Sequence, residues 1–167
     1  MAPPDPLPSG RFDAIVTEGT YGDREHAPPA VELFADAIRR TARRGGTVVI
    51  PAFAVDRTEV VLITLKSLME SGQIPQIPIF VDSPMALMSL AHYVEAAQNA
   101  SPDIREELVA AAHTGNPFDP GTLTAVRSVE ESKALNRPAG ARIIISASGM
   151  ATGGRVVHHW KTCCPTR

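Results

Sequence analysis

Short unbroken apolar runs alternate along the chain with longer segments in which apolar residues recur every three to four positions. The runs predict buried strands, and the longer segments predict amphipathic helices. Strands are expected at residues 13–17, 46–51, 77–81, 122–128 and 142–146. Helices are expected at residues 28–45, 56–72, 83–95, 104–112 and 129–136, and after residue 155. This order predicts an α/β fold, with a mostly parallel sheet and helices on both faces.

Capping signals mark several of these helix boundaries. Asp56 followed three residues later by Glu59 has the spacing of a capping box. Ser83 before Pro84 suits a helix cap followed by a first helical residue. Cations in the last turns of the first helix complement the negative end of its dipole, and these are Arg39, Arg40, Arg43 and Arg44.

Composition narrows the class of protein. With 167 residues, 44% of them hydrophobic, the chain is sized for one domain with a real core, and a net charge of -2 gives no global basic field for nucleic acid. The longest apolar run is too short to span a bilayer. The proline-rich arm at residues 1–12 lacks the features of a secretory signal, so a cytoplasmic location is expected. Cys163 and Cys164 provide neither a disulfide framework nor a cysteine metal site.

Candidate chemistry collects in the loops that follow the strands. Ligands of such sheets bind outside the carboxyl ends of the strands. Four polar loops are expected at this edge, at residues 17–26, 51–57, 82–85 and 146–155. Because the net charge is only -2, any anion site must be local, and these loops are the place to look for it.

Glu18 is the candidate catalytic residue of the first loop. It follows a predicted strand and precedes Gly19, so it could act as a general acid or base, or be an ordinary loop carboxylate. Polar residues that raise the odds of a site follow it closely, namely Tyr21, Asp23, Arg24 and His26. A single histidine does not make a zinc site, so no metal ligand is assigned.

The later loops offer phosphate contacts. Arg57 either points a guanidinium into the crevice or is a surface arginine, and Ser83 can both cap a helix and bind an anion. The run from Ser148 to Arg155, SGMATGGR, allows backbone amides to converge on a phosphate or serves tight packing alone. Its spacing is that of neither a dinucleotide fingerprint nor a P-loop. The two histidines at 158 and 159 are interpreted as helix residues first and ligands second.

Five ordered segments together resemble the β-CASP region of the metallo-β-lactamase superfamily of RNA-processing nucleases. They are TEGTYGDREH, GGTVVIPAFAVDRTEVVL, IPIFVDSPMAL, SVEESKALN and ISASGMATGGRVVHHWK. Similar proteins include bacterial and archaeal ribonucleases, the endonuclease of the cleavage and polyadenylation factor and RNase J. The resemblance covers residues 11–161, and it implies RNA phosphodiester hydrolysis in the complete enzyme.

The resemblance assigns roles to particular residues. Glu18 matches the acidic residue of the first β-CASP motif and is expected to support proton transfer at the active site. The residues expected to bind RNA phosphates are Tyr21, Arg24, His26, Arg57, Ser83, Ser148, Gly149 and Arg155. Two positions depart from the family pattern: Gly19 stands where serine is usual, and Asp56 stands where glycine is usual.

The resemblance also implies two zinc ions, whose ligands are not found in this sequence. The zinc-binding HxHxDH motif of the family precedes the matched region, and the last metal-ligand histidine follows it. We therefore expect no cofactor in this chain, no hydrolysis by it alone, and a missing metallo-β-lactamase catalytic domain as its partner.

The last residues suggest a frameshift. The family continues with a sequence like LLPDP, and codons for LLPDP read one base out of register spell CCPTR, the sequence of residues 163–167. A family strand expected after this point would then be missing, and an uncovered strand edge predicts a homodimer or aggregation. A stand-alone RNA or phosphate binder, a small nucleotide-binding α/β protein and an inert gene fragment remain alternatives.

Overall fold

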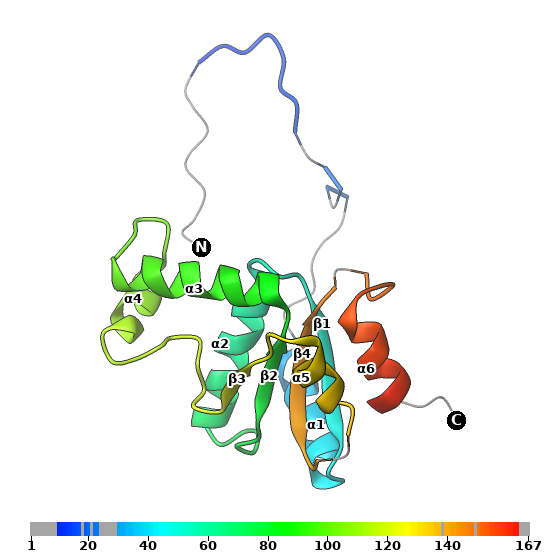
Figure 1. The fold of residues 1–167 in the computed structure, drawn as a ribbon. Coiled ribbons are helices and arrows are strands. Elements are labelled where there is room, and N and C mark those ends of the chain that lie inside the picture. The colour runs from blue at the N-terminus through cyan, green and yellow to red at the C-terminus, as the bar shows by residue number, and fades with distance from the viewer. Residues whose placement is uncertain are drawn as a thin grey trace.

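A computed structural model describes residues 10–17, 19–20, 22–23, 30–137, 139–148 and 150–163 (Figure 1). The described residues form a four-stranded, all-parallel sheet with the order β1-β4-β2-β3, together with six helices. In chain order the elements are α1 (Val31–Arg43), β1 (Thr47–Ala52), α2 (Arg57–Glu70), β2 (Ile79–Asp82), α3 (Pro84–Gln98), α4 (Glu106–Ala112), β3 (Leu123–Ala125), α5 (Val129–Ala134), β4 (Arg142–Ala147) and α6 (Arg155–Cys163).

Helices cover both faces of the sheet (Figure 1). Side chains alternate along β4, so Ile143 and Ile145 belong to a large apolar core with α1, α2 and α3. On the opposite face, Ile144 packs with Val126 and Leu135 in a much smaller cluster. That second face lies under α5 and α6. The predicted α/β fold with a parallel sheet is confirmed.

The predicted helix boundaries agree closely with the observed ones. Gly45 and Gly72 follow α1 and α2 with φ of 67° and 69°, a left-handed conformation that glycine adopts without strain. At the start of α3 the Ser83 hydroxyl accepts a hydrogen bond from the Ala86 amide at 3.1 Å, as its cap signal predicts. No helix in the described ranges is long and apolar enough to cross a membrane.

The predicted strand at residues 13–17 is wrong. This segment has no regular structure, and Ile15 and Val16 are 77% and 98% exposed. In Figure 1 it runs outside the sheet. A β-branched run forms a stable strand only when a neighbouring strand satisfies its backbone, and the described sheet provides none.

The predicted strand at 122–128 is real but shorter. Leu123–Ala125 form β3 beside β2, and the Val126 amide still donates to the Val81 carbonyl at 3.0 Å, but the two amides after it have other acceptors. The amides of Arg127 and Ser128 donate to Glu131 Oε2 at 2.7 and 3.0 Å, and Ser128 Oγ accepts from the Glu131 amide at 3.0 Å. This capping box starts α5 and ends the strand.

Candidate functional site at the carboxyl edge of the sheet

The carboxyl ends of β1, β4 and β2 lie side by side, because these strands are neighbours in the sheet. Ser146 pairs with Pro51 on one side and with Asp82 on the other. The Ser148 amide then donates to the Ala52 carbonyl at 2.9 Å. The loops that follow these three strands therefore begin at one edge, as the sequence predicts.

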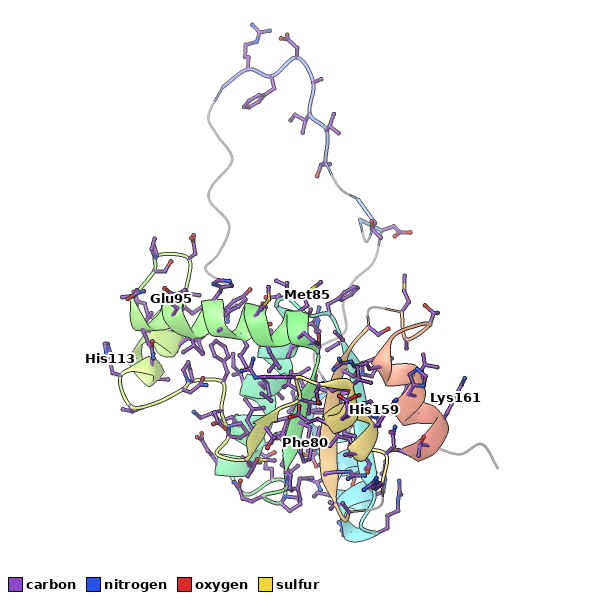
Figure 2. The ribbon with its side chains drawn as sticks, in the orientation of Figure 1. Phe80, Met85, Glu95, His113, His159 and Lys161 are labelled. Carbon is purple, nitrogen blue, oxygen red and sulfur yellow. The ribbon has the colours of Figure 1, made fainter. Side chains whose placement is uncertain are left out.

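Asp82, the last residue of β2, is the centre of a buried hydrogen-bond network. Its Oδ1 accepts a hydrogen bond from Arg155 Nη1 at 2.6 Å, and its Oδ2 accepts one from Ser132 Oγ at 2.6 Å. His159 Nε2 lies 2.7 Å from the same Oδ2, and Figure 2 labels His159 where α6 faces α5. One carboxylate thus joins β2 to both helices of the second face.

The network keeps this buried carboxyl ionised. Burial acts to raise the pKa of Asp82, but hydrogen bonds from His159, Ser132 and Arg155 outweigh burial and lower the pKa. The Asp82 side chain is fully enclosed, whereas 28% of the Arg155 side chain is exposed. The guanidinium therefore neutralises a buried charge from a position that still reaches solvent.

His159 is enclosed on both sides of its ring. The side chain is completely buried, and Nδ1 lies 2.8 Å from Asn136 Oδ1. His159 therefore cannot touch a substrate itself, and its contact with the carboxyl edge is made through Asp82. Its neighbour His158 is exposed, so both histidines are helix residues, in agreement with their sequence interpretation.

Sequence reasoning missed the polar residues of this network, namely Asp82, Ser132 and Asn136. A partial signal exists for Asp82, because a charged residue that closes an apolar strand is seldom left unpaired. The serine and the asparagine lie in a short helix and the turn after it, and nothing in the sequence distinguishes them from surface residues. Along the chain, Ser132 is 50 residues from its partner Asp82, and Asn136 is 23 residues from its partner His159.

Arg57 lies at the same edge, at the start of α2, and is exposed. The residue before it forms a γ-turn: Asp56 has φ 65° and ψ -52°, and the Arg57 amide donates to the Val55 carbonyl at 2.8 Å. In this conformation the Asp56 side chain makes no cap hydrogen bond, so the predicted capping box with Glu59 is wrong. The positive φ gives a physical reason why glycine suits position 56.

Glu59 instead points into the protein. Its side chain is buried, and neither carboxyl oxygen has a hydrogen-bond partner. Burial raises the pKa of Glu59, and nearby polar groups, including the Ser89 side chain, oppose only part of the shift. The Glu59 carboxyl therefore holds its proton to a higher pH than an exposed glutamate does.

Two predicted phosphate ligands, Ser83 and Ser148, also lie here. The buried Ser83 hydroxyl is already the acceptor for the cap of α3, and Ser148 is half-buried with its amide bound to β1. The glycine-rich loop then turns through Ala151 and Gly154, with φ of 53° and 79°, into α6. The chain thus brings Arg57, Ser83, Ser148 and Arg155 to one edge.

Five predicted site residues lie outside the described residues. They are Glu18, Tyr21, Arg24, His26 and Gly149. Their roles at the site stay predictions.

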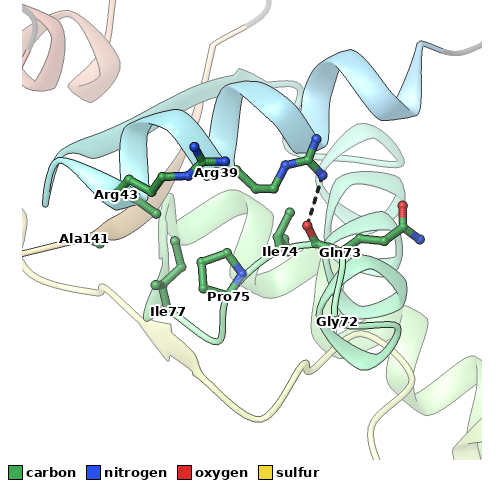
Figure 3. Close-up of a pocket in the computed structure, with 9 residues that line it drawn as sticks. Arg39, Arg43, Gly72, Gln73, Ile74, Pro75, Ile77 and Ala141 are labelled. Carbon is green, nitrogen blue, oxygen red and sulfur yellow. Dashed lines mark hydrogen bonds between the residues drawn. The ribbon is translucent and has the colours of Figure 1, made fainter.

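A cavity of about 480 Å³ lies at the opposite, amino-terminal end of the strands, between α1 and the loop after α2 (Figure 3). Arg39 and Arg43 line it above Pro75 and Ile77. Arg39 already donates to the Gln73 carbonyl at 3.1 Å and to Glu32 Oε1 at 2.6 Å. The cavity therefore shares no lining residue with the carboxyl edge, and the Arg39 guanidinium is already hydrogen-bonded within the protein.

The described residues do not fit the zinc pair that the resemblance implies. Zinc needs three or four closely grouped ligands. In the part of the chain that the structure describes, no group of three or more His, Cys, Asp and Glu side chains could hold a metal ion.

A sequence model of the Beta-Casp domain matches residues 58–167, about two thirds of the chain. The chain belongs to the β-CASP family. Three of the five segments that resemble β-CASP proteins contain the loops that follow β1, β2 and β4, so the family motifs meet at the carboxyl edge.

Curated β-CASP relatives match almost the whole chain. It is 38% identical over 160 residues to ribonuclease TTHA0252 of Thermus thermophilus, covering 95% of this chain and 36% of the relative. It is 31% identical to the transcription termination factor FttA of Methanothermobacter thermautotrophicus (92% and 24%), and 28% identical to an RNase J-like protein of Methanocaldococcus jannaschii (90% and 34%). The chain therefore spans a quarter to a third of the length of these relatives.

Proposed function

We propose that this β-CASP chain is the RNA-clamping part of a zinc-dependent metallo-β-lactamase-type ribonuclease. One observation carries the proposal. The buried Asp82 carboxylate fixes the guanidinium of Arg155, with 2.6 Å between Oδ1 and Nη1, at the same edge as Arg57. A guanidinium fixed in this way can contact phosphate without first losing side-chain freedom. Two relatives, a ribonuclease and an RNase J-like protein, support RNA as the substrate class.

Catalysis is assigned to a domain outside the described residues. Each relative is about three to four times as long as this chain, which supports a further catalytic domain in the complete protein. We propose that zinc ligands come from that domain, because the described residues offer no suitable group. The chain alone should bind single-stranded RNA and leave it intact when Zn²⁺ is added.

Fluorescence anisotropy of a labelled single-stranded RNA tests the clamp. Binding should weaken with salt, and an Arg57→Ala/Arg155→Ala variant should bind less tightly with a salt slope reduced by about 1.4, or about 0.7 per phosphate contact. Arg43→Ala/Arg44→Ala, which also removes two positive charges but just before the amino-terminal end of β1, is the matched control and should bind like the parent. Equal affinity of the parent and the double variant would contradict the proposal, and so would tight binding of a mononucleotide with no dependence on RNA length.

We also propose a weak homodimer through the edge of β1 that no described strand covers. The carbonyls of Gly46 and Ala52 accept hydrogen bonds from amides at the two ends of β4. Backbone groups alternate in direction along a strand, so those of Thr47, Val49 and Pro51 point away from β4. Pro51 has no N–H to donate, which limits pairing to a short stretch. Light scattering should show a mass that rises with concentration, and a constant monomer mass would contradict the dimer.

A further inference from the structure

The positive charge of Arg155 is largely cancelled by Asp82, whose carboxylate lies 2.6 Å away. Asp82 has a lowered pKa and remains ionised at neutral pH, so the pair formed with Arg155 has no net charge. A phosphate that approaches the exposed part of the guanidinium also meets the field of this carboxylate. A further positive charge in the network would restore attraction for an anion.

His159 is placed to provide that charge. Its Nε2 faces Asp82 Oδ2 at 2.7 Å, and its Nδ1 faces Asn136 Oδ1 at 2.8 Å. Both neighbours are hydrogen-bond acceptors, and a ring with two acceptors is satisfied only when each nitrogen carries a proton. A neutral ring would require the Asn136 amide to turn and present its NH₂ group.

We propose that Asp82 and His159 are positioning residues for phosphate binding by Arg155. Asp82 holds the guanidinium at the carboxyl edge, and the proton on His159 gives the three-residue network a net positive charge. This inference rests on the proposed function, because it concerns how the same edge binds RNA. Binding of a phosphate and protonation of His159 then favour each other.

Other charged groups near the network do not replace His159. From β4, Arg142 lies on the same face but donates to the Arg137 carbonyl at 2.6 Å and to Thr47 Oγ1 at 3.1 Å, away from Asp82. β1, which packs against α6, contains no titratable side chain. The remaining charged residues and the second histidine of α5 and α6 are exposed, namely Glu130, Glu131, Lys133, His158 and Lys161, and the half-buried thiol of Cys163 is the last residue of α6.

The sign of the pH effect follows from the charges. Imidazole changes its charge between about pH 5 and 8. At the acid end the network is positive and RNA affinity is high. With a neutral His159 ring, Asp82 cancels the charge of Arg155, and the affinity for RNA is lower.

The test measures RNA affinity by anisotropy between pH 5.5 and 8.5 at constant ionic strength. The parent should lose at least about fivefold in affinity over this range. His159→Gln, whose amide can still donate to Asp82, should lose this component of the profile, whereas the neighbouring His158→Gln should keep it. Asn136→Asp should move the profile to higher pH, because an added carboxylate stabilises the ring proton.

Nitrogen chemical shifts of the His159 ring give a second readout that needs no variant. Both ring nitrogens should be protonated at pH 6, and RNA should extend that form to higher pH. RNA binding without pH dependence, an unchanged profile in His159→Gln, or a neutral ring at pH 6 in the RNA complex would overturn the inference and leave the clamp intact. Absence of RNA binding at every pH would overturn both proposals.

Discussion

The two faces of the sheet bury different kinds of residue. The face under α1, α2 and α3 has a large apolar core that includes Ile38, Leu65 and Ile145, each no more than 1% exposed, and α2 also buries Glu59. The face under α5 and α6 has only a small apolar cluster and encloses Asp82 and His159 instead. The same parallel strands thus provide stability on one side and a polar network on the other.

This difference separates two uses of burial. Apolar packing on the first face stabilises the fold without depending on pH or on particular partners. On the second face, each buried polar group needs its partner, and the network ends at the edge where Arg155 reaches solvent. We therefore expect substitutions on the first face to change stability alone and substitutions on the second to change stability and RNA binding together.

The largest effect should come from Asp82→Ala. Removing the carboxylate leaves Arg155 and His159 without their acceptor, which should cost about 3–5 kcal/mol of unfolding free energy. Urea denaturation at pH 7 measures this loss, and RNA anisotropy on the folded fraction should show weaker binding. Ser132→Ala, which removes one donor only, should cost about 1 kcal/mol.

The pH dependence of that difference has a definite sign. The pKa of Asp82 is lower in the folded chain than the value of about 3.9 for an unfolded aspartate, so its stabilisation is present above about pH 4. It is lost as the pH falls through the folded-state pKa. The difference between parent and variant should therefore shrink below pH 4, and a difference that grows in acid would contradict the assigned network.

Leu65→Ala tests the other face. The side chain is fully buried among α2 and the sheet, so its truncation should cost about 2–5 kcal/mol in urea denaturation. Leu33→Ala, at a site that is 71% exposed, should change stability by no more than about 0.5 kcal/mol. RNA affinity of the folded Leu65→Ala protein should equal that of the parent, and a matching loss of affinity would remove the distinction between the faces.

The same contrast explains how far the sequence could predict the molecule. Apolar periodicity is a local signal, and it located the strands at 46–51 and 142–146 and the helices that cover them. It misplaced residues 13–17, because a strand also needs a neighbour that no local pattern reports.

The site divides in a similar way. Arg57, Ser83, Ser148 and Arg155 follow strand ends, so topology alone places them at one edge. The Asp82 network depends on three-dimensional proximity between α5, α6 and β2, which composition and spacing do not encode. Arg155 was predicted as a phosphate ligand, but its contact with Asp82 was not.

The smallest expected effect is at Asp56, where the loop after β1 leaves the sheet. Its positive φ costs a side chain about 1–2 kcal/mol, and glycine gives back about 0.5–1 kcal/mol through its greater freedom when unfolded. Asp56→Gly should therefore stabilise the chain by about 0.5 kcal/mol in urea denaturation, whereas Asp56→Ala keeps the strained Cβ and should not. Both variants remove the same carboxylate next to Arg57 and should strengthen RNA binding equally at low salt. Equal stability of the two variants would show that the γ-turn stores no strain, and the preference for glycine at this position would then reflect charge alone.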